Sequence, residues 1–173
     1  GQLEESKLSG NIDIDGSTLT GFVDAVYGKT LLGYKQSSKL YGNLLDKYVG
    51  YVFARACGHD IDFTFYYADN PPKKQTMASS QMPESLAKEK LATWIKMYKE
   101  GCQKLFPFYP DFEKPIEYVS SDWNFFISKV ESQFENEFRK APIDPYYIVA
   151  RDNGFFNESN FESFKENTIK ILS

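Results

Sequence analysis

The sequence predicts an α/β protein of the α+β kind, in which a small sheet comes first and a mainly helical half follows. Two turn signals between strand-like segments, a helical apolar stripe that leads into a further strand, and three later helical stripes support this prediction. The chain has 173 residues, which suits one domain better than two. We therefore expect a single domain over 1–173, with the sheet core over 8–68, a loop over 69–83 and helices over 84–173.

The sheet is expected to begin as a meander of three antiparallel strands within residues 8–35. Asp15-Gly16 is a hairpin turn signal, and it follows a stretch in which polar and apolar residues alternate. Gly28-Lys29 is a second turn signal, which separates the apolar-rich segments 22–27 and 30–34. Three successive strands joined by two tight turns are the simplest arrangement of these segments.

A helix and a fourth strand are expected next. The apolar residues between Leu44 and Ala56 recur with the spacing of one helical face, and Gly58 follows as a helix stop. Beyond it, apolar and polar residues alternate from Ile61 to Tyr67, as in a half-buried strand. A helix that connects the third strand to the fourth gives the order βββαβ.

The rest of the chain is expected to be a loop and then helices. Residues 69–83 are rich in turn-forming residues and predict a long loop, which is either functional or a plain connector. Three later stripes predict core-facing helices, the second capped by Ser121 or Asp122 and the third by Asn157. The stripes consist of Ala87, Leu91, Trp94, Ile95, Tyr98, Cys102 and Leu105, of Trp123, Phe126, Ile127, Val130, Phe134 and Phe138, and of Phe161, Phe164, Thr168, Ile171 and Leu172.

Composition narrows the classes of function. The chain is 42% hydrophobic and 25% charged, as folded proteins are, and no apolar stretch approaches the ~18 residues of a membrane-spanning helix. The net charge of −4 argues against many phosphate contacts, so any contact with nucleic acid is expected to be local or shared with a more basic partner. The aromatic fraction of 17% favours a core built on rings, with surplus rings at a surface that docks a partner.

Cysteine and histidine are too few for several common kinds of site. Cys57 and Cys102 lack CxxC spacing, so neither a disulfide framework nor a zinc site is indicated. His59 is the one histidine in the sequence, and it is expected in the turn between the helix and the fourth strand. Asp13 and Asp15 are likewise expected to be turn residues.

The hairpin of the second and third strands carries the informative pattern. A metal-dependent phosphodiesterase needs one carboxylate on each of two neighbouring strands, and a lysine two residues beyond the second carboxylate on the same face. Asp24 and Lys35 suit the first and last roles, but Gly33 stands where the second carboxylate would be. Asp24 is either a surviving metal ligand or a polar strand residue, and Lys35 is either a phosphate contact or an exposed strand-end residue.

This order of parts resembles the PD-(D/E)XK nucleases, and in particular the nuclease domains of bacterial recombination helicase-nucleases. Segment 21–24, Gly-Phe-Val-Asp, is similar to the family's Gly-x-x-Asp, and segment 31–35, Leu-Leu-Gly-Tyr-Lys, is similar to its Leu-Leu-Asp-Tyr-Lys. The resemblance places Leu44 and Tyr48 where the next helix of those nucleases carries a Gln and a Tyr. Two of the four matched positions, Gly33 and Leu44, therefore lack the polar side chain that the nucleases carry there.

A nuclease scaffold without its site is most similar to the C-terminal domain of RecC, the gamma chain of exodeoxyribonuclease V (RecBCD). The similarity extends to segments 37–58, 87–110 and 144–146 and to the closing helix from Asn157. It implies a restriction-endonuclease-like core, no catalytic residue and no metal or other cofactor in this domain, with ATP and Mg²⁺ used by partner subunits. It also implies that the 173 residues are the tail of a longer polypeptide.

The resemblance further implies a role without catalysis in double-strand-break repair and recombination. The domain would scaffold the helicase-nuclease, guide the separated DNA strands and dock RecD. The expected partners are RecB-like and RecD-like subunits and double- and single-stranded DNA, without a membrane, in the bacterial cytoplasm. Lys73 and Lys74 are either contacts to DNA or a partner, or a solvated pair in the loop.

Two other functions stay open at this point. One is an active Mg²⁺-dependent PD-(D/E)XK deoxyribonuclease that draws its second acid from elsewhere, such as Asp62 on the fourth strand. The other is a stand-alone protein-interaction domain that has no role on DNA.

Overall fold

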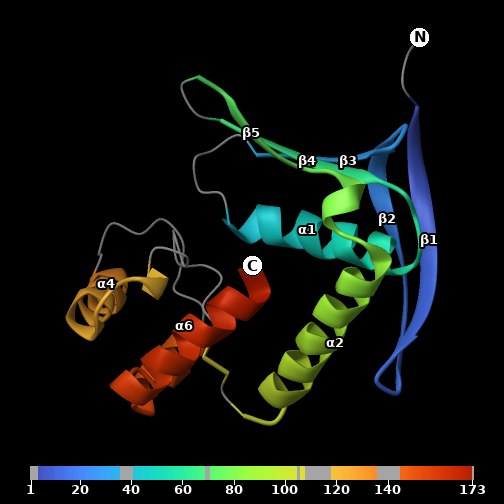
Figure 1. The fold of residues 1–173 in the computed structure, drawn as a ribbon. Helices are drawn as coiled ribbons and strands as arrows, with labels where there is room; N and C mark the ends of the chain where they lie inside the picture. The colour runs from blue at the N-terminus through green and yellow to red at the C-terminus, as the bar shows by residue number, and fades with distance from the viewer. Residues whose placement is uncertain are drawn as a thin grey trace. The chain divides into compact units, whose positions relative to one another are not determined.

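The first half of the chain forms one five-stranded mixed sheet in this computed structural model, which describes residues 4–35, 41–68, 71–104, 106–107, 118–135 and 145–172 (Figure 1). The strands are β1 (Glu5–Ile14), β2 (Ser17–Tyr27), β3 (Thr30–Lys35), β4 (Asp62–Tyr67) and β5 (Lys73–Met77). They follow one another across the sheet in chain order, and β3 and β4 form the parallel pair. This confirms the predicted α/β class and the meander whose third strand is joined to the fourth through a helix.

Both predicted turns close their hairpins. Asp15 and Gly16 have φ angles of +47° and +71°, the left-handed pair that a two-residue turn between twisted strands requires. Gly28, in the turn between β2 and β3, also has a positive φ of +62°. The β1–β2 pairing then extends along nearly the whole of both strands, whereas the β2–β3 pairing ends at Val26 and Leu31.

The helix α1 (Tyr41–Ala56) covers one face of the sheet and packs against β1 to β4 (Figure 1). It ends just before Gly58, the predicted stop, whose φ is +86°. Phe63 and Phe65 alternate along β4 as predicted and are buried beneath the helices. The helix α2 (Glu84–Gly101) adds Ala87 and Leu91 to this core. In the described part of residues 1–97, no helix lies on the opposite face of the sheet.

Strand β5 lies within the segment 69–83 that was predicted to be a loop, so that prediction is wrong for residues 73–77. β5 pairs antiparallel with β4 over its whole length. Its side chains are exposed apart from the half-buried Met77, so the sequence carries no apolar alternation that would reveal a strand. Backbone hydrogen bonds to the edge of β4 hold β5 in the sheet.

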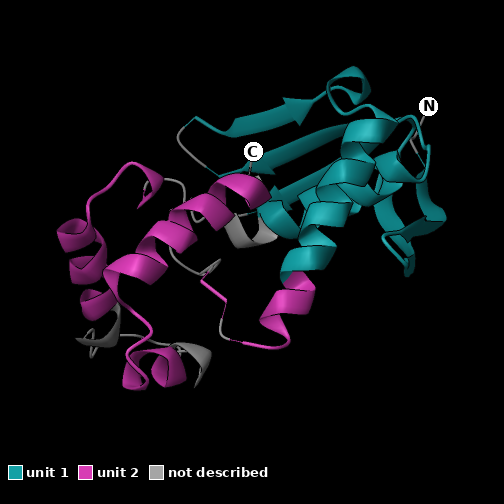
Figure 2. Ribbon diagram, turned by 60° about the horizontal axis from the view of Figure 1, so that its bottom comes forward, with its two compact units in different colours: residues 1–97 teal, residues 98–173 magenta. Residues whose placement is uncertain are grey.

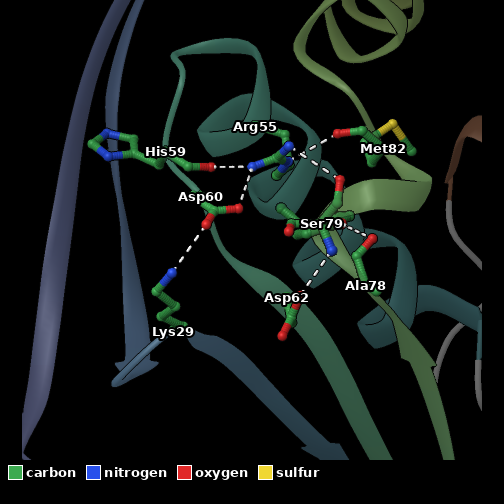
Figure 3. Close-up of polar contacts among 9 residues, drawn as sticks. Lys29, Arg55, His59, Asp60, Asp62, Ala78, Ser79 and Met82 are labelled. Atoms are coloured by element: carbon green, nitrogen blue, oxygen red, sulfur yellow. Dashed lines mark hydrogen bonds and ion pairs between the residues drawn. The ribbon is translucent and has the colours of Figure 1, made fainter.

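The guanidinium group of Arg55, in the last turn of α1, ties the helix to the segments around it (Figure 3). It donates hydrogen bonds to the carbonyl oxygens of His59 at 2.7 Å and Met82 at 2.9 Å. It also donates to the Ser79 carbonyl at 3.0 Å and lies 3.4 Å from the carboxylate of Asp60. The Arg55 side chain is 11% exposed, so these bonds form largely out of water, where they are stronger than at the surface. His59 lies in the helix-to-strand turn, as predicted.

The chain divides into two compact units, residues 1–97 and 98–173 (Figure 2). The boundary falls within α2 rather than before it, because Ala87 and Leu91 pack into the core of the sheet. Further along the same predicted stripe, Tyr98 is 73% exposed, so the prediction of a core position there is wrong. The single domain over 1–173 stays a prediction.

The described part of the second unit contains the helices α4 (Trp123–Glu135), α5 (Pro145–Asp152) and α6 (Glu158–Leu172). Rings on α4 and α6 pack against each other, as Phe126 and Phe161 do at a centroid distance of 4.6 Å. The predicted caps are confirmed: Asp122 accepts the Phe125 N–H at 2.8 Å, and Asn157 accepts the Asn160 N–H at 3.0 Å. Phe138 and Leu105 of the predicted stripes lie outside the described residues. Within the described ranges, no helix combines the length and the apolarity needed to cross a membrane.

Replacing Arg55 by Ala should lower the free energy of unfolding by about 3 kcal/mol, because three carbonyl oxygens lose a charged donor. Chemical denaturation followed by circular dichroism measures the loss. Lys88→Ala is the matched control, since its ion pair with Glu84 is about half exposed. That variant should lose less than about 0.5 kcal/mol. Equal losses in the two variants would contradict the role given to Arg55.

Candidate functional site

Lys47 of α1 connects two of the residues that the hairpin pattern predicted. Its Nζ lies 3.3 Å from Oδ1 of Asp24 on β2, in an ion pair whose side chains are 34% and 48% exposed. Its Cγ lies 3.2 Å from the point that a Cβ at Gly33 on β3 would occupy. Asp24 and Gly33 therefore lie along the same lysine side chain, on the face of the sheet that α1 covers.

Gly33 has no room for a side chain. Its register partner on β4 is Phe65, whose side chain is completely buried. A Cβ at position 33 would lie 2.5 Å from Phe65 Cδ2 and 2.9 Å from Cε2, well inside the ~3.5–4.0 Å at which carbon atoms pack. The Phe65 ring and the aliphatic stem of Lys47 thus fill the space at Gly33, where the nuclease pattern would have its second carboxylate.

A kink in β2 sets the position of Asp24. The next residue, Ala25, has a φ of +57°, which non-glycine residues rarely adopt. The β1–β2 register shifts at this point, and the Ala25 N–H donates to Glu5 Oε1 at 3.0 Å. The same carboxylate accepts the Tyr27 hydroxyl at 3.3 Å, and its charge raises the pKa of Tyr27. Irregular strand geometry of this kind re-aims the neighbouring side chain, here that of Asp24.

The remaining predicted positions have separate surroundings. Lys35 lies two residues beyond Gly33 on the regularly paired β3, so it projects to the same face as predicted. Leu44 is partly buried against the sheet core. Tyr48 is buried, and burial raises its pKa. Its ring lies at centroid distances of 6.4, 6.2 and 5.9 Å from those of Tyr51, Phe63 and Trp94.

Lys47 was not among the predicted site residues, although it is the α1 residue that reaches Asp24. It lies three residues after Leu44 and four before Tyr51, on a helix face that is otherwise apolar. A lysine on such a face buries its aliphatic stem, and its ammonium group needs a polar environment. That spacing is the sequence signal that could have identified it.

Asp62, the alternative second acid, lies apart from Asp24. Its register partner is Thr30, the first residue of β3, and strand alternation places it on the face opposite to Phe63. Its Oδ1 accepts the Ser79 N–H at 2.8 Å (Figure 3). Within the residues that the structure describes, no group of three or more His, Cys, Asp or Glu is placed to hold a metal ion.

The two lysines predicted to contact DNA or a partner lie on strand β5, not in a loop. Lys73 is the register partner of Tyr67 and Lys74 that of Tyr66, both on β4. Both lysines are exposed. Because successive strand residues project to opposite faces, each lysine extends from a different face of the sheet.

Comparison with known proteins identifies a family to which most of the chain is similar. A family model described as the RecC C-terminal domain matches residues 1–115, which include the whole first unit and all the predicted site residues. A search of curated proteins finds no significant match to the chain. The family match agrees with the resemblance that the hairpin segments carry.

Replacing Gly33 by Ala should destabilise the first unit by about 1–3 kcal/mol, because the new Cβ forces the Phe65 ring to shift. Gly21→Ala on β2 is the matched control, since a Cβ there would lie 3.8 Å from the Phe53 ring, an ordinary contact. The control should change stability by less than about 0.5 kcal/mol. Chemical denaturation compares the two, and wild-type stability in Gly33→Ala would refute the close packing at this glycine.

Proposed function

The chain belongs to the family of RecC C-terminal domains, and from that premise we propose that it is a nuclease-like domain without catalytic activity. RecC is a subunit of RecBCD, an ATP-dependent helicase-nuclease complex of DNA repair and recombination. In this proposal the domain scaffolds the complex, guides the separated DNA strands and docks the RecD-like subunit. Partner subunits use ATP and Mg²⁺ and cut the DNA, in the bacterial cytoplasm.

The filled space beside Asp24 is the observation that carries the proposed lack of catalysis. Mg²⁺ demands several oxygen ligands in octahedral geometry, and one carboxylate supplies too few. The Asp24 carboxylate is already paired with the Lys47 ammonium group, while Phe65 takes the volume of a side chain at position 33. A metal ion between Asp24 and position 33 would have to displace the side chain of Lys47.

The composition supports a docking role. The net charge of −4 is unfavourable for a surface that grips many phosphates, whereas fifteen Phe and twelve Tyr supply rings of the kind enriched at protein interfaces. Exposed rings occur in both units, such as Phe22 in the first and Phe125 in the second. RecB-like and RecD-like subunits are therefore the proposed protein partners.

The 173-residue chain should not cleave linear single- or double-stranded DNA in Mg²⁺ or Mn²⁺. Gly33→Asp should not create cleavage either, because Phe65 and Lys47 still occupy the site and one added carboxylate cannot complete the metal coordination. Gel analysis of end-labelled DNA measures both. Wild-type cleavage that disappears in Asp24→Ala would overturn the proposal, while cleavage unchanged by Asp24→Ala would mark a contaminating nuclease.

Co-expression tests the docking role separately. The chain, carried on an affinity tag, should retain a co-expressed RecD-like subunit through a gel-filtration column, because the proposal gives the domain a stable interface with it. An unrelated helicase of similar size is the control. Elution of the chain and the RecD-like subunit in separate peaks would contradict docking and leave the result on cleavage standing.

A further inference from the structure

Tyr34, Tyr66 and Lys74 lie side by side across three neighbouring strands. Tyr34 on β3 is the register partner of Tyr66 on β4, and Tyr66 is the register partner of Lys74 on β5 (Figure 1 shows the three strands). Register partners project to the same face, and neighbouring strands are ~4.8 Å apart, so the three side chains form one continuous row. We call it the Tyr–Lys row.

The Tyr–Lys row lies on the sheet face away from α1. Phe65 and Gly33, which immediately precede the two tyrosines in sequence, both face the helix, so the tyrosines face the other way. Tyr34 is 74% exposed and Tyr66 is 46% exposed. Because paired strands hold their backbones, these rings lose little conformational freedom when a ligand covers them.

The Tyr–Lys row carries its positive charge on Lys74, which is exposed. One residue further along the same strands, Lys35, Tyr67 and Lys73 form a second row of register partners. This second row projects from the helix-covered face, opposite to the Tyr–Lys row, and its Tyr67 packs partly against the core there. The Tyr–Lys row therefore combines two exposed rings with one lysine, on a chain whose net charge is −4.

We propose that the Tyr–Lys row binds single-stranded nucleic acid, with successive bases stacked on Tyr34 and Tyr66 and a phosphate against Lys74. This inference rests on the strand-guiding role proposed above and gives that role a surface. Stacking on aromatic rings accepts every base, as a guide for strands of any sequence requires. Binding through rings also needs few phosphate contacts, which agrees with the acidic balance of the chain.

Two observations favour a single strand over other partners. The base faces of a duplex are stacked on each other and are not open to Tyr34 or Tyr66, whereas unpaired bases can stack on exposed rings. Protein interfaces are enriched in Arg and depleted in Lys, and the cation of the Tyr–Lys row is a lysine. The charge and the rings together therefore match an unpaired strand better than a duplex or a protein.

Fluorescence anisotropy of a labelled oligothymidine of about 15 nucleotides, with EDTA present, tests the inference on the 173-residue chain. Tyr34→Ala and Tyr66→Ala should each weaken binding about 5- to 100-fold, as the loss of one base–ring stack does. Tyr34→Phe and Tyr66→Phe keep the rings and should stay within about twofold of the wild type. Lys74→Gln should reduce the slope of log affinity against log salt concentration by about 0.7.

Tyr98→Ala is the matched control. Tyr98 is 73% exposed, as Tyr34 is, but it lies on α2 and outside the sheet, so its removal should leave the affinity unchanged. Circular dichroism of each variant verifies that the fold is intact. A duplex of the same length should bind at least about tenfold more weakly than the single strand, because its bases are not available for stacking.

Wild-type affinity in both Tyr34→Ala and Tyr66→Ala would overturn the inference, and so would equal binding of duplex and single strand or no binding of the single strand. If the two variants lose a co-purifying RecD-like subunit while DNA affinity is unchanged, the row is a protein-docking surface and the inference is wrong. Each of these results leaves the proposed lack of catalysis intact. The cleavage assay, run separately with metal ions, tests that proposal.

Discussion

The close approach of β4 and α1 to Gly33 is the constraint on which the helix-covered side of this sheet depends. β3 and β4 are in register here, so the buried Phe65 ring lies directly beside the glycine. The stem of Lys47 approaches the same point from the helix. Protein interiors are packed to the density of organic crystals, so an added atom at position 33 clashes and a smaller ring at 65 leaves a void. The sheet and the helix thus fit together around a residue that has no side chain.

Local signals in the sequence predicted most of the first unit, and the failures have a common cause. Asp15-Gly16 encodes its turn in two residues, and the apolar periods of α1 and β4 are each contained in one segment. Strand β5 has no such signal, because its side chains are exposed and its backbone is ordered by β4. Tyr98 continues the apolar stripe of α2 beyond the part of the helix that packs on the sheet, so periodicity alone misplaces it.

The candidate site shows the same division between local and long-range information. The turn at Gly28 placed Asp24 and Gly33 on adjacent strands, and the sequence predicted that correctly. The contact of Lys47 with Asp24 crosses 23 residues of the chain, and it depends on how α1 lies over the sheet. The neighbouring positions of Tyr34 and Tyr66 depend on the register of two parallel strands, which a helix separates in sequence. Alternation within a strand predicts on which face of the sheet a residue lies, but not which residue lies beside it on the next strand.

The two faces of the sheet differ in how freely their residues can change, and this bears on the proposed loss of catalysis. A metal site beside Asp24 would require changes at Gly33, Phe65 and Lys47 together. A carboxylate added at position 33 alone overpacks the core at about 1–3 kcal/mol, and truncating Phe65 alone costs about 3–5 kcal/mol. Domains have only about 5–15 kcal/mol of net stability, so each intermediate carries a large penalty. The exposed rings of the opposite face can change without touching that core. Packing therefore keeps the space at Gly33 occupied by Phe65 and Lys47. The exposed residues of the opposite face are free of this constraint and can change to suit a ligand.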